Sequence, residues 1–565
     1  VVLILKRTWW KESIAYQIYV RSFKDTNGDG IGDLKGIIEK LDYLKDIGFD
    51  MVYLNPINKS PNDDNGYDIS DYYDIMDEFG TMEDFNLLVE ELHKRDMKLI
   101  MDMVINHTSD EHPWFVKSRS SKDNPYRNYY IWQHGKDGNP PNNWGSFFGG
   151  SAWEYDEVTG EYYLHLFSKK MPDLNWRCDE VRKEIFKMIK FWIDAGVDGF
   201  RFDAINHLEK DFNFPDAEVK EGQLYGDFIK YVQNLPKVHD YIRQLRKTLF
   251  NTGDHVLIGE TGGISYHNAF IYTGEDRGEL DMTFHFDMHS VGRGKNAWEK
   301  RKIDLVHEIK NSMSGWQQRD DKEGWCPIFY SNHDSTRTVS RLGNDRDYHN
   351  KSAKMLATLQ LTQKGTPFIY YGDEIGMTNA WDFELEDYRD ASIFNKYRDF
   401  VDTGLVTREN YIKGLHLTSR DNSRTPMQWN DSRNAGFSDA KPWIRVNSNY
   451  KEINAALQIN NPDSILNYYK KLIKLRKNND TLIYGKFIEI NKENEEIYSY
   501  IRELGDEVFL IIANFFDGTP EFILPDSVKI NDPNLVLANY PCSSSELNNM
   551  KLRPYEARIY KCKIK

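Results

Sequence analysis

The chain has 565 residues, and its 73 Lys and Arg against 88 Asp and Glu give a formal net charge of −15. That length predicts two or three domains, and the acidic excess argues against nucleic acid or a membrane as a partner. Only four cysteines occur, without metal-ligand spacing, so no disulfide framework or zinc site is expected and a reducing compartment is favoured.

Short β-rich runs alternate with amphipathic helical stretches from about residue 9 to residue 480, as in βα units around a parallel sheet. Strands are predicted at 15–19, 51–55, 98–105, 199–203, 256–260, 282–286, 328–332 and 367–371. This pattern predicts an α/β fold, a (β/α)8 TIM barrel formed by residues 1–106 and 177–480.

Two segments depart from that alternation. Residues 107–176 lose helical periodicity and are rich in Asn, Pro, Gly, Trp and Tyr, which favours a small domain inserted after the third strand over a structureless loop. Residues 481–565 alternate apolar and polar side chains between turn residues. They predict a C-terminal antiparallel β domain, a β-sandwich.

The residues after the first strand form an oxygen-rich loop. Asp25, Asn27, Asp29 and Asp33 alternate with glycines and Ile31, as in the start of an EF-hand loop, but the bidentate Glu is missing because Gly36 stands at the twelfth position. A turn without metal is the simpler alternative.

Acidic residues stand at the carboxyl ends of three predicted strands. Asp203 ends the fourth strand, Glu260 ends the fifth, and Asp334 follows the seventh. In a TIM barrel this rim is the catalytic face, whereas solvated acidic residues would fall mostly on helices. Arg201 shares a face with Asp203 by period-2 geometry, so it is expected to keep Asp203 ionised, although a structural ion pair is the simpler reading of the two residues alone.

Further polar residues follow the third strand. Asp102 and Asn106 share a face, and His107 comes at the rim. His107 and His333, each beside such residues, are candidates for neutral hydrogen-bond donors, although a lone histidine is more often a packed residue.

These segments resemble the four short conserved regions of the α-amylase family, glycoside hydrolase family 13: residues 102–107, 199–203, Glu260 and 333–334. Residues 171–176 resemble a fifth region typical of the oligo-1,6-glucosidase branch, and the similarity runs nearly end to end. The resemblance implies that Asp203 is the nucleophile, Glu260 the acid/base and Asp334 the carboxylate that distorts the ring. Implied substrate-binding residues are Asp64, Tyr67, His107, Phe147, Phe167, Arg201, His333 and Arg420, with Phe148 equally well explained by core packing.

The resemblance also implies a structural Ca²⁺ bound by the loop described above, with Asp25, Asn27, Asp29, Ile31 and Asp33 as ligands. No organic cofactor is expected.

Three positions depart from the pattern. Met171 stands where relatives usually have Gln, and Ser392 stands where they usually have Glu. Ala204 follows the nucleophile where a valine goes with α-1,6 preference and a smaller residue more often with α-1,4 linkages. Because a pocket methylene discriminates by only about 1 to 3 kcal/mol, the linkage stays open between α-1,6 and α-1,4.

The resemblance therefore implies a cytoplasmic, retaining exo-α-glucosidase acting on short isomalto- or malto-oligosaccharides, with sucrose as a further candidate substrate. The main alternative is a sucrose isomerase or glucosyltransferase using the same glucosyl-enzyme intermediate. Against it, the Arg-Leu-Asp-Arg-Asp segment of sucrose isomerases does not occur after Phe286. A non-catalytic sugar-binding or chaperone relative is a further alternative, which the retention of all three carboxylates argues against.

Overall fold

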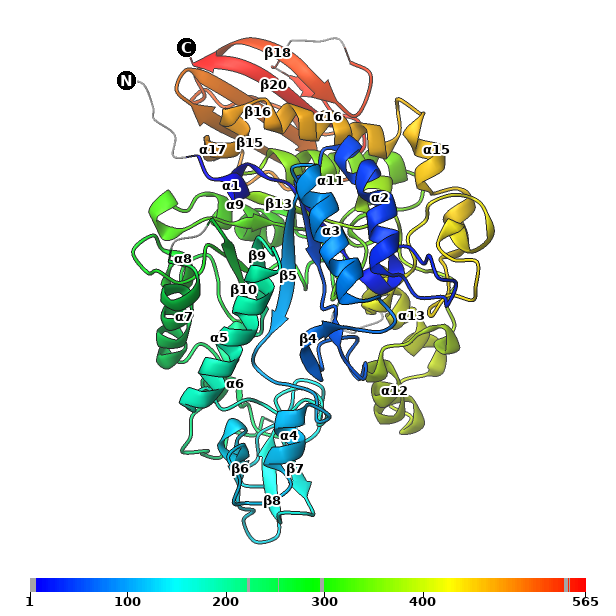
Figure 1. The fold of residues 1–565 in the computed structure, drawn as a ribbon. Coiled ribbons are helices and arrows are strands. Elements are labelled where there is room, and N and C mark those ends of the chain that lie inside the picture. Colours follow the sequence, from blue (N-terminus) through cyan, green and yellow to red (C-terminus); the bar gives the residue numbers. More distant parts are fainter. Residues whose placement is uncertain are drawn as a thin grey trace.

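The computed structural model describes residues 7–220, 224–251, 254–294, 299–542, 547 and 549–564. Its centre is an eight-stranded parallel sheet (Figure 1). The strands are β1 (Ala15–Ile18), β2 (Met51–Leu54), β5 (Lys98–Val104), β9 (Gly199–Asp203), β10 (Val256–Glu260), β11 (Met282–Phe284), β12 (Pro327–Ile328) and β13 (Thr366–Tyr370). Their order is β11-β10-β9-β5-β2-β1-β13-β12, and the two end strands contact each other, which closes a barrel.

Each strand predicted from the sequence is confirmed, although β11 and β12 are shorter than expected. The strands are buried on both faces, which explains their nearly continuous apolar sequences. Tyr53, Ile100 and Ile258 fill the barrel interior from alternate positions of β2, β5 and β10. The (β/α)8 fold is thus confirmed.

Amphipathic helices surround the barrel (Figure 1). In α3, a capping box between Thr81 and Asp84 fixes the start, and Phe85, Leu88 and Leu92 are buried. The larger helices are α2 (Leu34–Ile47), α3 (Met82–Lys94), α5 (Asp179–Asp194), α7 (Pro236–Leu249), α11 (His349–Thr362), α13 (Arg408–Thr418) and α16 (Ile465–Lys477). Shorter ones are α1 (Trp9–Glu12), α8 (Phe270–Thr273), α9 (Asn311–Gln317), α10 (Thr338–Leu342), α12 (Ala391–Tyr397), α14 (Asp421–Arg424), α15 (Ala455–Ile459) and α17 (Asp480–Tyr484).

The segment between β5 and α5 forms a separate small unit, at the bottom of Figure 1. It contains α4 (Pro113–Ser118) and an antiparallel sheet of order β6-β8-β7, from β6 (Trp132–Gln133), β7 (Trp153–Asp156) and β8 (Glu161–Leu164). Residues 211–220 and 224–232, which include α6 (Ile229–Val232), pack on it, and Asn142 donates to the carbonyl of Phe214 at 3.2 Å. The sequence analysis did not foresee this second segment.

The C-terminal part forms a five-stranded antiparallel sheet at the opposite end of the molecule (Figure 1). Its order is β14-β15-β16-β20-β18, from β14 (Lys486–Ile490), β15 (Ile497–Leu504), β16 (Glu507–Asn514), β18 (Ile530–Ala538) and β20 (Ala557–Ile564). Two short pairs complete the strands: β17 (Glu521–Phe522) with β19 (Met550–Lys551), and β3 (Asn58–Lys59) with β4 (Asp71–Ile75). Arg502 joins the sheet to the barrel by donating to the carbonyl of Thr362 at 2.7 Å.

Within the described ranges, no helix is long and apolar enough to cross a bilayer.

Candidate active site

A pocket of about 1050 Å³ opens at the carboxyl ends of the strands. Arg201 and His333 lie behind its wall, against a smaller adjoining cavity. Of the residues singled out from the sequence, those that line the large pocket are Asp64, Tyr67, His107, Phe147, Phe148, Phe167, Asp203, Glu260, Asp334 and Arg420. Side chains far apart in the sequence are therefore brought to one site.

Arg201 connects three carboxylates at the ends of neighbouring strands. Its Nη1 donates to Asp102 Oδ1 at 2.9 Å and to Asp203 Oδ1 at 2.7 Å, and its Nη2 lies 2.8 Å from Glu260 Oε1. Asp102 is the direct register partner of Arg201 across β5 and β9. The period of the strands thus places one guanidinium between the two candidate catalytic carboxylates.

Ala204 turns the chain sharply after Asp203. Its backbone has φ 45° and ψ 33°, the left-handed region that costs an ordinary residue about 1 to 2 kcal/mol. The turn begins the 3-10 helix η3 (Ile205–His207) and directs the Ala204 N–H to Glu260 Oε2 at 3.2 Å. The acid/base candidate is therefore held by both a guanidinium and a backbone amide.

The pKa of Asp203 is shifted in the direction opposite to the one expected from the sequence. Burial raises the pKa of Asp203 well above its ordinary value; Arg201 opposes this, whereas the nearby carboxylates of Glu260 and Asp102 add to it. The physical reason is that one guanidinium is shared by three carboxylates and cannot compensate all of them. Burial and the neighbouring carboxylates therefore outweigh Arg201 in setting the direction of the Asp203 pKa shift.

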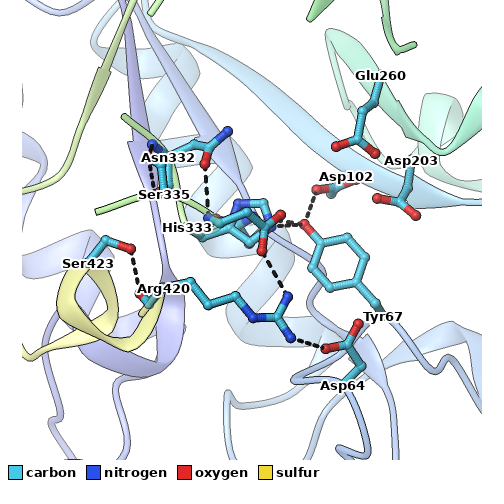
Figure 2. Close-up of polar contacts among 12 residues, drawn as sticks. Asp64, Tyr67, Asp102, Asp203, Glu260, Asn332, His333, Ser335, Arg420 and Ser423 are labelled. Carbon is cyan, nitrogen blue, oxygen red and sulfur yellow. Dashed lines mark hydrogen bonds and ion pairs between the residues drawn. The ribbon is translucent and has the colours of Figure 1, made fainter. Parts of the chain in front are cut away.

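Arg420 gathers a second group of carboxylates on the opposite wall. It donates to Asp334 Oδ1 at 3.0 Å, to Asp64 Oδ1 at 3.1 Å and to Asp390. Figure 2 shows Arg420 reaching Asp64, with Asp203 and Glu260 further along the same space. Asp390 was not predicted as a site residue, although it stands two residues before Ser392 in a stretch that departs from the family pattern.

Two of the three carboxylates next to Arg420 have pKa values shifted in opposite directions. Burial raises the pKa of Asp64 to about 7 despite the opposing effect of Arg420. For Asp334, burial is outweighed by His333, Arg420 and Arg424, which hold its pKa well below the ordinary value. Asp334 is therefore charged throughout the neutral range.

His333 is oriented by buried amides that the sequence analysis missed. Its Nδ1 accepts from Gln17 at 3.2 Å and Asn55 at 3.0 Å, which leaves the Nε2 proton for Asp334 at 2.9 Å. Tyr67 stacks on the imidazole with ring centroids 5.4 Å apart. Gln17 lies one residue before the end of β1 and Asn55 directly follows β2, so position near a strand end, rather than charge alone, was the available signal.

His107 is buried and neutral, because burial lowers its pKa to about 4. Its Nε2 lies 3.2 Å from the carbonyl of Tyr67, and its ring packs against Phe167 at 5.2 Å. Phe147 stacks on Phe167 at 5.2 Å, and Phe148 lies beside Arg420. The inserted unit thus contributes an aromatic wall to the pocket, with Phe148 in it.

The three departures from the family pattern all lie on the pocket wall. Met171 is almost completely buried there, and Ala204 and Ser392 line the same space. Ser392 donates its backbone N–H to Asp390 Oδ1 at 2.9 Å at the start of α12. The positions that differ are therefore in contact with the site.

The loop predicted to bind Ca²⁺ has the oxygen chemistry that this ion prefers. Asp25 accepts from the backbone amides of Gly28 and Gly30, both at 2.8 Å, and Asp33 caps α2 by accepting from Gly36 at 2.7 Å. In the parts of the chain that the structure describes, no three acidic, His or Cys side chains gather as a metal-binding group. The donor types fit calcium, whereas the carboxylates here are directed at the loop's own backbone.

Comparison with known proteins is consistent with this geometry. Residues 17–485 match the family "Alpha amylase, catalytic domain", and residues 497–559 match "Alpha-amylase SusG C-terminal domain". An oligo-1,6-glucosidase of Parageobacillus thermoglucosidasius is 51% identical, covering 99% of this chain and 100% of the relative. The trehalose-6-phosphate hydrolase of Bacillus licheniformis is 44% identical with a TM-score of 0.93, covering 99% and 100% of the two chains.

A second solved structure shows the same likeness. The isomaltulose synthase of Erwinia rhapontici NX5 is 45% identical with a TM-score of 0.93, covering 99% of this chain and 100% of that one. The matched catalytic domain and the nearly complete coverage of both chains agree with each other. The chain belongs to the α-amylase family of glycoside hydrolases.

Proposed function

We propose that this glycoside hydrolase is a retaining exo-α-glucosidase of the oligo-1,6-glucosidase type, which releases glucose from the non-reducing end of short α-glucosides. The observation that carries the proposal is Arg201, which holds Asp203 and Glu260 together on adjacent strand ends. Retention requires two carboxyl groups that flank one anomeric carbon. The full-length likeness to an oligo-1,6-glucosidase supports the substrate class.

In the first step Asp203 attacks the anomeric carbon and Glu260 gives its proton to the glycosidic oxygen, which leaves with the aglycone. In the second step Glu260 takes a proton from water, and the water oxygen displaces Asp203 from the glucosyl group. Glu260 thus gives up its proton in the first step and regains one from water in the second, so that the pair of carboxyl groups ends as it began. Two inversions at one carbon retain the α configuration.

The Arg420 group suits the non-reducing glucose. Asp64 and Asp334 face the pocket as hydrogen-bond acceptors for sugar hydroxyls and are fixed by the same guanidinium. His107 and the Tyr67–His333 stack lie alongside. This arrangement supports binding of a terminal glucose, and the aromatic wall restricts long polymers.

The anomer that appears first tests the mechanism. We expect proton NMR of isomaltose hydrolysis to show α-glucose before mutarotation. Initial β-glucose would overturn the retaining mechanism, and no turnover of isomaltose or maltose would overturn the substrate class.

Transfer to sugar in place of water is the second candidate, favoured by the close likeness to an isomaltulose synthase. We assign hydrolysis as the main outcome because the isomerase segment is missing after Phe286. Incubation with sucrose decides the question: glucose and fructose are expected, and accumulation of isomaltulose or trehalulose would overturn the assignment.

We also propose that the loop of Asp25, Asn27, Asp29, Ile31 and Asp33 binds a structural Ca²⁺, supported by its oxygen donors. The ion would neutralise carboxylates next to the start of α2. Addition of Ca²⁺ to chelator-treated protein should raise the melting temperature. An unchanged melting temperature together with no bound ion in the purified protein would refute it. A cytoplasmic location is proposed as well, supported by four cysteines that are all free thiols.

A further inference from the structure

The pocket contains positive charge that no carboxylate neutralises. Arg293 and Lys396 both line it. No ion pair joins either side chain to a carboxylate among the residues that the structure describes, whereas Arg420 contacts three. Arg293 and Lys396 therefore differ from the arginines that pair with the catalytic carboxylates, because their charges have no carboxylate partner among the described residues.

Arg293 is the better defined of the two. Its guanidinium is partly buried, and burial alone lowers its pKa, with no anion opposing the effect. Its Nη2 lies 3.2 Å from His289 Nε2, which therefore accepts. Burial and the charge of Arg293 lower the pKa of His289 to about 4, so this imidazole is neutral and contributes no competing proton.

A second guanidinium stands behind the first. Arg341 is buried, and both of its Nη groups donate to main-chain carbonyls, those of Met288 and Tyr330. Burial, followed by repulsion from Arg293, lowers the pKa of Arg341 to about 10. Two guanidinium groups that repel each other at low dielectric would both be stabilised by an anion placed in the pocket next to Arg293.

The carboxylates of the pocket that belong to the proposed catalytic machinery already have cationic partners. Asp203 and Glu260 are paired with Arg201, and the three carboxylates on the other wall are paired with Arg420. Ser392, on the same helix as Lys396, adds no charge. The carboxylates of the catalytic side are thus engaged by Arg201 and Arg420, and none of them pairs with Arg293 or Lys396 in the described part of the chain.

The position of Arg293 determines which part of the substrate meets it. Arg293 lies in the loop after β11, the strand whose last residue, Phe284, pairs with Glu260 of β10. Glu260 protonates the leaving oxygen in the proposed mechanism, so the strand next to it borders the leaving group rather than the terminal glucose. An anion at Arg293 would therefore belong to the aglycone.

We propose that the acceptor side of the pocket receives an anionic aglycone, so that the enzyme cleaves α-glucosides whose reducing-end sugar carries a phosphate. This inference rests on the proposed α-glucosidase function and specifies its substrate class. Guanidinium groups bind phosphate through paired N–H donors, and a sugar carboxylate offers related chemistry. Phosphate is the better match, because it carries close to two negative charges and three acceptor oxygens, whereas a carboxylate carries one charge and two oxygens.

Kinetics on matched disaccharides test the proposal. The full-length protein is assayed for glucose release from isomaltose, from isomaltose phosphorylated on the reducing-end glucose, and from the analogue with glucuronate at that end. We expect kcat/KM to be about tenfold or more higher for the phosphorylated substrate than for isomaltose, with the advantage declining as salt is added. Preference for glucuronate over phosphate would overturn the phosphate assignment.

Arg293→Gln should reduce kcat/KM for the phosphorylated disaccharide about tenfold more than for isomaltose, and Arg293→Lys should restore part of the difference. Arg301→Gln is the matched control, because Arg301 loses the same charge nearby but pairs with Glu308 at 2.8 Å outside the pocket. The control should leave both substrates unaffected. Melting temperatures verify that all variants fold.

The two proposals fail separately. If isomaltose is cleaved and its phosphorylated form is cleaved no better, the anionic aglycone is refuted and the α-glucosidase function stands. If only the phosphorylated form is cleaved, the neutral oligosaccharide class is refuted and the anionic aglycone stands. Equal losses on both substrates in Arg293→Gln would assign Arg293 a general role and refute its role in anion binding.

Discussion

Lys210 and Asp173 form an ion pair of 2.7 Å in which both side chains are completely buried. Lys210 also donates to Asn106 Oδ1 at 2.9 Å, and Asp173 accepts from the backbone N–H of Leu166 at 2.9 Å. The pair therefore joins the end of β5, the inserted unit and the chain after β9. Its hydrogen bonds hold the aromatic wall of the pocket on the barrel.

Lys210→Met should destabilise the protein by about 3 to 5 kcal/mol, because it leaves the carboxylate of Asp173 buried without its cation. Thermal and urea unfolding measure the loss. Lys220→Gln is a matched control, since Lys220 belongs to an exposed pair with Asp227 and its loss should change stability little. Equal stability of Lys210→Met and the wild-type protein would show that the pair does not hold the inserted unit.

The sequence predicted the barrel well because its determinants are local and periodic. Each strand is a short apolar run, and catalytic carboxylates at strand ends meet wherever a parallel barrel closes. Gln17 and Asn55 also lie near the carboxyl ends of strands, but their uncharged side chains gave no reason to select them as site residues. Their role in orienting His333 depends on contacts across three strands.

Other features could not be read from local pattern. The packing of residues 211–220 and 224–232 on the inserted unit joins segments far apart in the chain. The left-handed backbone conformation of Ala204 could not be predicted from the sequence, because alanine normally avoids that conformation. The protonation of Asp203 also depends on how many carboxylates share Arg201, a number set by three strands together.

Acid should weaken the inserted unit through His112. This imidazole caps α4 by accepting from the Trp114 N–H at 3.1 Å, and burial lowers its pKa to about 3. The unfolded chain, with a histidine pKa near 6.5, binds the proton first, so this stabilisation is complete above pH 6.5 and is lost as pH falls toward 3. The loss between pH 7 and pH 5 should be about 2 kcal/mol.

His112→Asn isolates that effect, because asparagine caps a helix but does not titrate in this range. The stability difference between wild type and variant, measured by urea unfolding at pH 7 and pH 5, should shift in favour of the variant at the lower pH. A difference that is the same at both pH values would contradict the assignment.

Asp203→Asn should reduce kcat by on the order of 10⁴-fold or more, because an amide cannot form the glucosyl ester. The fold should be retained, since asparagine can still accept a hydrogen bond from Arg201. Activity on isomaltose and the melting temperature are measured together. Near-wild-type activity would refute the nucleophile assignment, and the Lys220→Gln control should keep full activity.

Met171 and Ser392 should act together on what accepts or leaves with the glucose. Both line the pocket, and each replaces a polar group usual in relatives, an amide and a carboxylate. Restoring them in Met171→Gln with Ser392→Glu should change the ratio of kcat/KM for isomaltose to maltose about fivefold or more, because such polar contacts contribute about 1 to 3 kcal/mol.

The two single variants separate additive from coupled effects. The carboxylate should also oppose an anionic aglycone, so the double variant should lose any preference for a phosphorylated disaccharide. An unchanged isomaltose to maltose ratio in the double variant would refute an acceptor role for both positions. A changed ratio with an undiminished phosphate preference would place the carboxylate away from Lys396, on the side of the pocket that contacts the neutral sugar ring.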